Sequence, residues 1–271
     1  MEATLKYLTS IQPPRNYKNL DSLNRVAEYL KSRFEGFGLQ TEYMPYMIEQ
    51  REYKNIIATI NPNAKHRLVM GAHYDVYGEF QGADDNASAV AGLVQSAKLL
   101  SCEDISIRID FVAFSTEEPP YFLNGNMGSQ RHAKMLKEQG VELIGVINYE
   151  MIGYFSDEPN SQNYPYPLME MIYPNTGNFI AAVANESSKE FLEELGLKNA
   201  YKKIGYESML LPDDVAHIAA SDQISYWEQG YKGVMISDTA HFRNPNYHTK
   251  NDTIDTLDIE KMGFVVELVV E

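Results

Sequence analysis

Cysteine is nearly absent from this chain of 271 residues, because Cys102 is the only one. A single cysteine excludes a framework of internal disulfides and disfavours both a cysteine-rich zinc site and a cysteine nucleophile. Any metal ion bound by this chain must therefore be held by histidine and carboxylate side chains.

Basic residues are also in short supply, with 23 Lys and Arg against 38 Asp and Glu, which gives a formal net charge of -15. Such an acidic chain repels phosphate backbones and anionic lipid surfaces. We therefore expect neither nucleic acid nor membrane as a partner.

No apolar run approaches the roughly 20 residues that span a bilayer. The opening "MEATLKYLTSIQPPRNY" also lacks the apolar core of a signal peptide. We expect a cytoplasmic location for the chain as given, and a secreted or periplasmic one if a signal segment was removed from it. Without a linker or an internal repeat, residues 1–271 are predicted to form one domain, with an N-terminal helical lead-in at about residues 1–45.

Short apolar runs alternate with helical patterns along most of the chain. Helices are expected at residues 19–38, 87–101, 129–140, 187–198 and 256–270, and strands at 53–60, 66–73, 105–114, 141–155, 178–185 and 231–237. Residues 157–174 are rich in proline and predict a long loop. The alternation favours a single α/β domain, in which helices flank both faces of a central mixed, mostly parallel β-sheet.

Acidic and histidine side chains follow four of the expected strands, in "LVMGAHYD", "DFVAFSTEE", "GVINYEM" and the later "SDTAHFRNPNYHTKNDT". Ligands of such sheets bind outside the carboxyl ends of the strands, so these side chains should meet in one crevice. Buried charges must be paired, hydrogen-bonded or bound to metal. A pair of divalent ions needs histidines, carboxylates and one bridging carboxylate, and the sequence offers His73, Asp84, Glu118, Glu150 and His248.

The motifs "AHYD", "GADDNASA", "STEE", "NYEMIG" and "NYHTKNDT" occur in the order found in the M28 zinc aminopeptidases, so the chain resembles that family from about Asn55 to its C-terminus. The resemblance implies a zinc-exopeptidase-like fold, a metallopeptidase activity and two Zn²⁺ ions. Mn²⁺ or Co²⁺ are possible substitutes, because they occupy similar sets of ligands.

The resemblance also implies a role for each site residue. His73 and Glu150 would bind one ion, Glu118 and His248 the other, and Asp84 would bridge the two. Glu117 would be the general base that activates water. Asp75 would orient the side chain of His73.

Three further residues have roles suggested by their positions. Asp85 is expected to be structural, holding the loop that presents Asp84. Tyr247 could donate a hydrogen bond to the substrate carbonyl. Arg243 could bind a substrate carboxylate or carbonyl. For both Tyr247 and Arg243, a role in packing the loop is an equal alternative.

Two features differ from many family members. Between "EE" and "GS" the chain has the nine residues "PPYFLNGNM" (119–127), where many relatives have a shorter linker. Position 150 is Glu, where many aminopeptidases of the family have Asp. Neighbouring residues of a strand point to opposite sides. Glu117 and Glu118 can therefore act together only if the chain leaves the sheet before them, as "EEPPYFLNG" suggests.

The leading interpretation is hydrolysis of the N-terminal peptide bond of a peptide with a free N-terminus. A glutaminyl-peptide cyclase with one zinc would need only Asp84, Glu118 and His248. A carboxypeptidase is a third reading, suited by Glu150 and Arg243. A non-catalytic binding domain on a peptidase scaffold is disfavoured because every motif position is filled.

Overall fold

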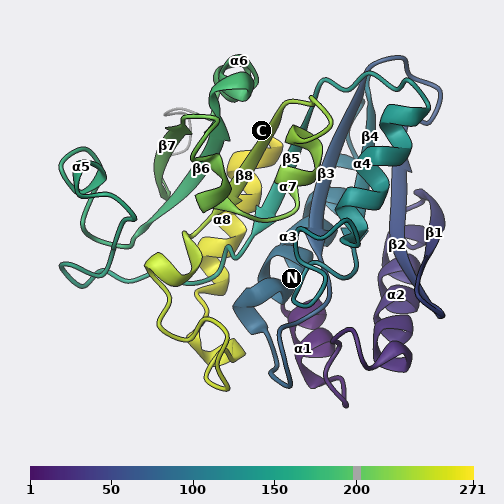
Figure 1. Ribbon diagram of the computed structural model, residues 1–271, viewed down its shortest axis with the longest axis horizontal. Helices are drawn as coiled ribbons and strands as arrows, with labels where there is room; N and C mark the ends of the chain where they lie inside the picture. Colours follow the sequence, from purple (N-terminus) through teal and green to yellow (C-terminus); the bar gives the residue numbers. More distant parts are fainter. Residues whose placement is uncertain (198–202) are drawn as a thin grey trace.

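The centre of the molecule is a twisted sheet of eight strands in the order β1-β2-β4-β3-β5-β8-β6-β7, seen in a computed structural model that describes residues 1–197 and 203–271 (Figure 1). The strands are β1 (Gln40–Ile48), β2 (Arg51–Ile60), β3 (Arg67–His73), β4 (Arg108–Phe114), β5 (Gly145–Glu150), β6 (Phe179–Asn185), β7 (Gly205–Leu211) and β8 (Gly233–Ser237).

Four neighbouring strands, β4, β3, β5 and β8, run parallel to one another. Strands β1 and β2 add an antiparallel edge on one side, while β6 pairs antiparallel with β8 and parallel with β7 on the other. Every residue of β5, β6 and β8 is buried, as expected of central strands covered on both faces. The mixed, mostly parallel sheet predicted from the sequence is confirmed.

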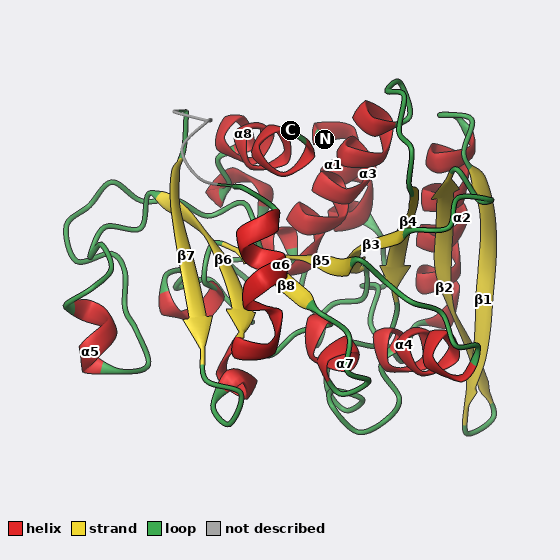
Figure 2. Ribbon diagram, turned by 90° about the horizontal axis from the view of Figure 1, so that it is seen from above, coloured by secondary structure: helices red, strands yellow, loops and turns green. Residues whose placement is uncertain are grey.

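Helices cover both faces of the sheet (Figure 2). The α-helices in the described part of the chain are α1 (Glu2–Ser10), α2 (Leu20–Glu35), α3 (Ala89–Leu100), α4 (Gly128–Glu138), α5 (Pro167–Glu170), which lies away from the sheet, α6 (Lys189–Glu194), α7 (Gln223–Trp227) and α8 (Ile259–Val270). Helices α1, α2, α3, α6 and α8 pack into the large apolar core on one face. Helices α4 and α7 pack with smaller apolar clusters on the other face.

The N-terminal lead-in differs from its prediction. Helices occupy residues 2–10 and 20–35, but residues 40–48 form β1 rather than continuing a helical segment to about residue 45. These residues become a strand because each one pairs with a residue of β2, from Gln40 with Thr59 to Ile48 with Arg51. Cross-strand pairing of this kind overrides local propensity.

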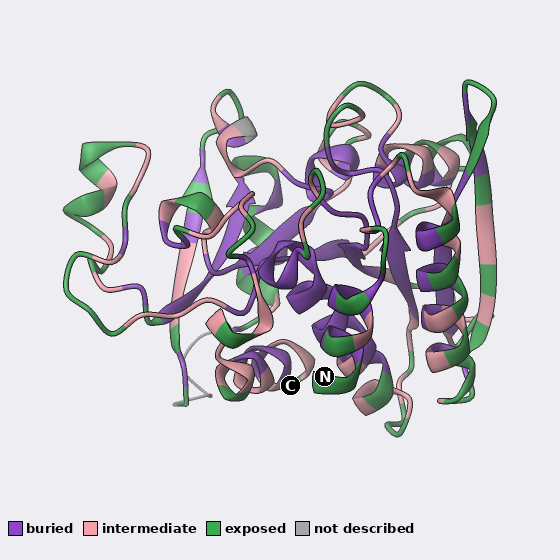
Figure 3. Cartoon of the chain, turned by 90° about the horizontal axis from the view of Figure 1, so that it is seen from below, coloured by how far each residue is buried: buried purple, intermediate pink, exposed green. Residues whose placement is uncertain are grey.

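Two other predictions need adjustment. The loop expected at residues 157–174 contains the short helix α5, which lies at the far edge of the molecule with most of its surface exposed (Figure 3). The helix expected at residues 187–198 is α6, and position 198 lies outside the described residues. Among the described residues, no helix has both the length and the apolar character needed to cross a membrane.

Candidate functional site

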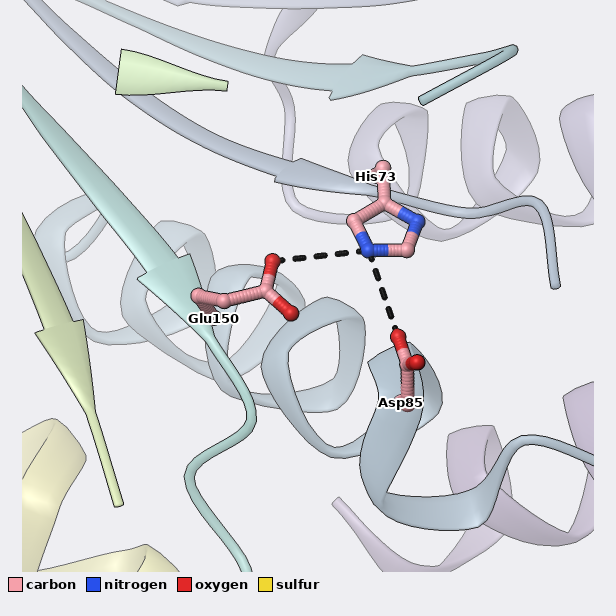
Figure 4. Close-up of side chains that lie close together, drawn as sticks. All are labelled: His73, Asp85 and Glu150. Carbon is pink, nitrogen blue, oxygen red and sulfur yellow. Dashed lines mark ion pairs between the residues drawn. The ribbon is translucent and has the colours of Figure 1, made fainter. Parts of the chain in front are cut away.

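The site begins where two parallel strands end, because His73 is the last residue of β3 and Glu150 the last of β5. The Nε2 atom of His73 lies 3.4 Å from a carboxylate oxygen of Glu150 and 3.4 Å from one of Asp85 (Figure 4). His73 is 1% exposed and Asp85 is 4% exposed. The side chains of this first group of ligand-type atoms are therefore almost wholly buried.

A second group shares Asp85 with the first. The other carboxylate oxygen of Asp85 lies 2.9 Å from His248 Nε2, which in turn lies 3.5 Å from Glu118 Oε1. In each group of three, one ligand atom per residue lies within 4.8 Å of the others. Asp85 thus joins two adjacent groups that each contain one histidine and two carboxylates.

The structure corrects the assignment of the shared position to Asp84. One carboxyl oxygen of Asp84 accepts a hydrogen bond from the Gly153 amide at 3.0 Å, and the other accepts one from Asn244 Nδ2 at 2.7 Å. Asp84 belongs to neither group of ligand atoms, and the residue expected to be structural, Asp85, belongs to both. The two neighbours separate because the backbone is left-handed at Gly82 and leaves the helical conformation at Asp85 and Asn86, within the irregular helical segment η1 (Ala83–Ser88).

Gly82 makes this turn possible. Its φ of +58° lies in the left-handed region, which disfavours residues with a Cβ. A Cβ at this position would also clash with the carbonyl oxygen of Asp85 and with Val76. The backbone can therefore present Asp85 to the two histidines only with glycine at position 82.

The pair Glu117 and Glu118 lies in a loop beyond the sheet, because β4 ends at Phe114. Thr116 has a φ of +61°, and the chain turns there. The predicted exit from the sheet before the glutamate pair is confirmed. Glu118 joins the second group of ligand atoms, and Glu117 Oε2 lies 3.8 Å from His73 Nε2 at the edge of the first.

Asp75 connects this loop to His73. Its two carboxylate oxygens accept the backbone amides of Glu117 and Glu118, each at 3.1 Å. One of them also lies 3.4 Å from His73 Nδ1, on the ring edge opposite to Glu150. A carboxylate in this place fixes both the ring and the loop, as an outer partner of a ligand histidine does.

Aromatic rings enclose His248 on both sides. The ring centroids of Tyr77 and Tyr247 lie 3.9 Å and 3.8 Å from that of His248, with interplanar angles of 3° and 17°. Tyr247 also lines the cavity described below. Burial raises the pKa of the Tyr247 hydroxyl, and nearby carboxylates raise it further, so the group stays an O–H donor.

Arg243 is buried away from the ligand atoms. Its Nε donates to Gln162 Oε1 at 2.8 Å and its Nη1 donates to the Phe179 carbonyl at 2.7 Å. It is not among the described residues that line the cavity. The guanidinium therefore serves the packing of loops rather than contact with a ligand in that cavity.

Several residues that the sequence reasoning left without a role support the site. Asp252 accepts the backbone amides of Asp84 and Asp85, and Asn86 Nδ2 and Ser221 Oγ donate to Glu150 Oε2 at 3.0 Å and 2.7 Å. Asn86 and Asp252 stand inside the quoted motifs "GADDNASA" and "NYHTKNDT", which was a usable signal. Ser221 stands in no such motif.

Asp222 is a second residue that the sequence did not reveal. It is fully buried, and neither of its carboxyl oxygens has a hydrogen-bond partner of good geometry among the described residues. Burial raises its pKa to about 7, against the opposing effect of His73. A buried acid this close to the ligand atoms adds to the negative potential of the site.

The charges of the site are strongly coupled. Burial raises the pKa of Glu118 to about 8, with a further contribution from Asp85. Burial also raises the pKa of Glu117 well above its usual value, against the opposing effect of His73. Burial disfavours a charged His73, yet the carboxylates of Glu117 and Glu150 raise its pKa well above its usual value. The carboxyl groups therefore need positive charge close to them, which divalent cations supply.

The donor atoms fit zinc. Each group offers one imidazole nitrogen and carboxylate oxygens, the mixed set that zinc prefers when thiolates are lacking. Glu118 Oε1 and His248 Nε2 are buried without a hydrogen-bond partner of good geometry among the described residues. Buried polar atoms of this kind are normally satisfied, and a bound cation would satisfy these two.

A cavity of about 280 Å³ opens beside the ligand atoms. Asp85, Glu117, Glu118, Glu150 and His248 line one end. The rest of the lining is mainly apolar and includes residues of β8, β6 and β7. The lining of this apolar end includes Met169, Val183, Met209, Leu211, Ile218 and Met235.

Trp227, the only tryptophan of the chain, packs behind this apolar end. Its indole Nε1 donates a hydrogen bond of 3.1 Å to the carbonyl of Gly233, the first residue of β8. It belongs to the same apolar cluster as Met169, Met209 and Met235. The ring is thus part of the structure that shapes the cavity without lining it.

Comparison with known proteins agrees with this geometry. The family model described as Peptidase family M28 matches residues 55–271. A protein of Escherichia coli strain K12, described as uncharacterized protein YfbL, is 39% identical over 279 residues, covering 100% of this chain and 85% of the relative. A probable leucine aminopeptidase of Trichophyton verrucosum is 25% identical over 92% of this chain, which spans 66% of that relative's length.

Solved structures share the fold. The LapA aminopeptidase of Legionella pneumophila aligns with a TM-score of 0.77 at 21% identity, covering 99% of this chain and 68% of that one. A glutaminyl cyclase of Tannerella forsythia aligns with a TM-score of 0.72 at 19% identity, covering 99% of this chain and 94% of that one. Both chemistries are therefore found on the scaffold described above.

Proposed function

The chain belongs to peptidase family M28, whose model matches it over residues 55–271, and we propose that it is an aminopeptidase that uses two zinc ions to remove the N-terminal residue of peptides. As a member of this family it is a metal-dependent hydrolase of peptides. The names of several curated relatives, probable leucine aminopeptidase, support the choice of the N-terminal bond.

The observation that carries the proposal is the position of Asp85 between two groups of ligands. His73, Asp85 and Glu150 would hold one zinc ion, and Asp85, Glu118 and His248 the other. Bound zinc acts as a Lewis acid on the scissile carbonyl and lowers the pKa of water. Mn²⁺ or Co²⁺ would occupy the same ligands in the proposed site.

Glu117 is the proposed general base. It lines the cavity and lies beside the first group without belonging to either, so its carboxylate is free to act on a proton. It would take a proton from the attacking water and deliver it to the nitrogen of the departing amine. Tyr247, which stays protonated and lines the same cavity, would donate its hydroxyl hydrogen to the carbonyl oxygen as negative charge develops there.

The lining of the cavity disfavours a substrate carboxylate. Four acidic residues line it, and among the described residues no lysine or arginine does. The two zinc ions would balance the charge of these carboxylates, and the α-carboxylate of a carboxypeptidase substrate would find no lysine or arginine in the lining to pair with. Arg243, the cation that a carboxypeptidase would need, is committed to Gln162 and Phe179.

The apolar end of the cavity would hold the first side chain of the peptide. Met169, Met209 and Met235 come from three different elements of the fold, and methionine adapts to apolar groups of varied shape. We therefore expect leucine and methionine to be preferred over small or charged residues at the N-terminus of the substrate.

The test is metal content by mass spectrometry together with hydrolysis of a panel of aminoacyl chromogenic substrates. We expect two metal ions per chain and hydrolysis of leucyl and methionyl substrates. The variant Glu117→Gln should retain both ions while kcat falls by about 10²–10⁴-fold, because it keeps the shape of the side chain but removes the base. Glu142→Gln, an exposed glutamate on the same chain, is the matched control and should leave kcat unchanged.

Other results would point to the competing functions. One metal ion per chain, with no hydrolysis but with cyclisation of an N-terminal glutamine, would replace the proposal with a glutaminyl cyclase, whose fold this chain shares. Protein that takes up no metal and turns over no substrate would support a binding domain instead.

A further inference from the structure

One side of the apolar end of the cavity is formed by an extension of the fold. After β5 the chain leaves the sheet and returns to it at β6, and residues 156–177, called the arm from here on, lie between (Figure 1). Gln162, Asn163, Tyr164, Pro165 and Met169 of the arm line the cavity. The tip is exposed, since Met171 is 83% exposed and Leu168 is 64% exposed. The shape of the cavity therefore depends on where the arm is held.

Arg243 contacts the chain on both sides of the arm. Its Nη1 donates to the carbonyl of Phe179 at 2.7 Å and to that of Tyr154 at 3.5 Å, so it connects the residues just before and just after the arm. The guanidinium also lies 4.5 Å from the centre of the Phe179 ring. A side chain on Gly177 would meet the stem of Arg243 at 2.8 Å, so glycine lets the arm approach this closely.

Gln162 extends the hold to the wall of the cavity. Its Oε1 accepts from Arg243 Nε at 2.8 Å, and its Nε2 donates to Thr239 Oγ1 at 2.9 Å. The next residue, Asn163, donates its backbone amide to the carbonyl of Phe242 at 2.8 Å. Arg243 and its neighbours in sequence thus fix Gln162 and Asn163. The next arm residues in the lining of the cavity are Tyr164, Pro165 and Met169.

We propose that Arg243 is a positioning residue for substrate selectivity: it holds the arm against the cavity so that Met169 closes the space around the first side chain of the peptide. The inference rests on the proposed aminopeptidase function. A wall that moves away loses its van der Waals contacts with a long side chain, but a short side chain that never reached the wall loses nothing. Loosening the arm should therefore weaken binding of large first residues selectively.

The first experiment compares two methionines of the arm. Met169 lines the cavity, and Met171, two residues away, is exposed. Met169→Ala should lower kcat/KM for leucyl and methionyl substrates about tenfold, mainly through KM, and change that for alanyl substrates less than twofold. Met171→Ala should leave the whole panel unchanged.

The second experiment changes the contacts by which Arg243 positions the arm. Gln162→Ala removes the link to the wall and leaves the other contacts of Arg243 in place, while Arg243→Lys keeps the charge but loses the planar fork of donors. Both should show the same selective rise in KM as Met169→Ala. Hydrogen exchange should be faster at the amides of Gln162, Asn163 and Gly177, a readout that does not depend on catalysis.

The control for this pair is Asp157→Ala, which removes an exposed arm hydrogen bond to Asn178. It should change neither selectivity nor exchange at Gln162. If the Gln162 and Arg243 variants lower kcat/KM equally for all substrates, or leave exchange in the arm unchanged, the positioning role is overturned. If the unaltered enzyme cleaves no aminoacyl substrate, the proposed function itself has failed, and the two failures are thereby distinguished.

Discussion

Asp84 and Asp85 are adjacent in the chain but have different roles, since Asp85 belongs to both groups of ligand atoms and Asp84 supports the structure around them. The motif "GADDNASA" offers two adjacent aspartates with identical chemistry. Which of them meets the histidines is decided by the turn at Gly82 and by the Gly153 amide and the Asn244 side chain, which donate hydrogen bonds to the other. The sequence could therefore predict that one aspartate is shared between two groups, but not which one.

These adjacent aspartates allow a matched comparison. Asp85→Asn should remove a carboxylate from both groups, so metal content should fall below one ion per chain and kcat by more than about 10²-fold. Asp84→Asn should keep its metal, because Asp84 belongs to neither group. It should lower the free energy of unfolding by about 1–3 kcal/mol, since a buried acceptor is replaced by an amide. Metal analysis and urea unfolding of both variants check this, and equal metal loss in the two would contradict it.

At the scale of elements, the sequence revealed the central strands and the longer helices, because their apolar patterns are strong. It did not reveal β7 or the end of the lead-in, β1. The burial pattern of β7 is mixed, and its place in the sheet is set by pairing with β6. Edge strands of this kind depend on pairing with a neighbouring strand, which the apolar pattern of the strand itself does not contain.

The contact between helices α4 and α7 contains a buried titratable group. His132 of α4 is fully buried, and its Nδ1 lies 2.6 Å from the hydroxyl of Tyr226 in α7. Burial lowers the pKa of His132 to about 3, with a further contribution from Arg67. The two helices therefore pack around a neutral imidazole.

This burial predicts a loss of stability in acid. Between pH 6.5 and about 3 the unfolded chain binds a proton at His132 that the folded chain does not, so the contribution of this group to stability falls as pH falls. At pH 5 the loss is about 2 kcal/mol, from 1.36 kcal/mol per pKa unit. Urea unfolding at pH 7 and pH 5 should show this difference in the unaltered protein and not in His132→Gln.

The exposed His66 provides the control, because His66→Gln should keep the acid sensitivity of the parent. A His132→Gln variant that loses as much stability between pH 7 and pH 5 as the parent does would refute the assignment.

At the scale of the whole molecule, the N-terminal segment is joined to the site, although it precedes the part matched by the family model. Arg15 is 1% exposed and donates to the carbonyls of Tyr74, Gln81 and Gly82. These carbonyls follow His73 and precede Asp85 along the chain. The arginine thus ties residues 1–19 to the backbone that carries both ligands, a link that no pattern in the first 45 residues indicates.

Replacement of Arg15 should lower the stability of the whole domain. Arg15→Lys keeps the charge but cannot reach three carbonyls, and the buried acceptors that it leaves without partners should lower the free energy of unfolding by about 2–5 kcal/mol. Arg25→Lys, at an exposed arginine of α2, should stay within about 0.5 kcal/mol of the parent. Equal stability of the two variants in urea would show that the N-terminal segment is not part of the cooperative unit.

The location of Trp227 gives the protein a built-in optical reporter. Nineteen tyrosines are spread over the chain, but there is one tryptophan. Excitation at a wavelength that only tryptophan absorbs therefore reports on a single ring, which lies behind the apolar end of the cavity. A ligand that displaces water from that end changes the polarity around Met209 and Met235, with which the indole packs. A fluorescence titration with a peptide or an inhibitor can therefore follow filling of the cavity without any attached label, even in a variant that has lost catalysis.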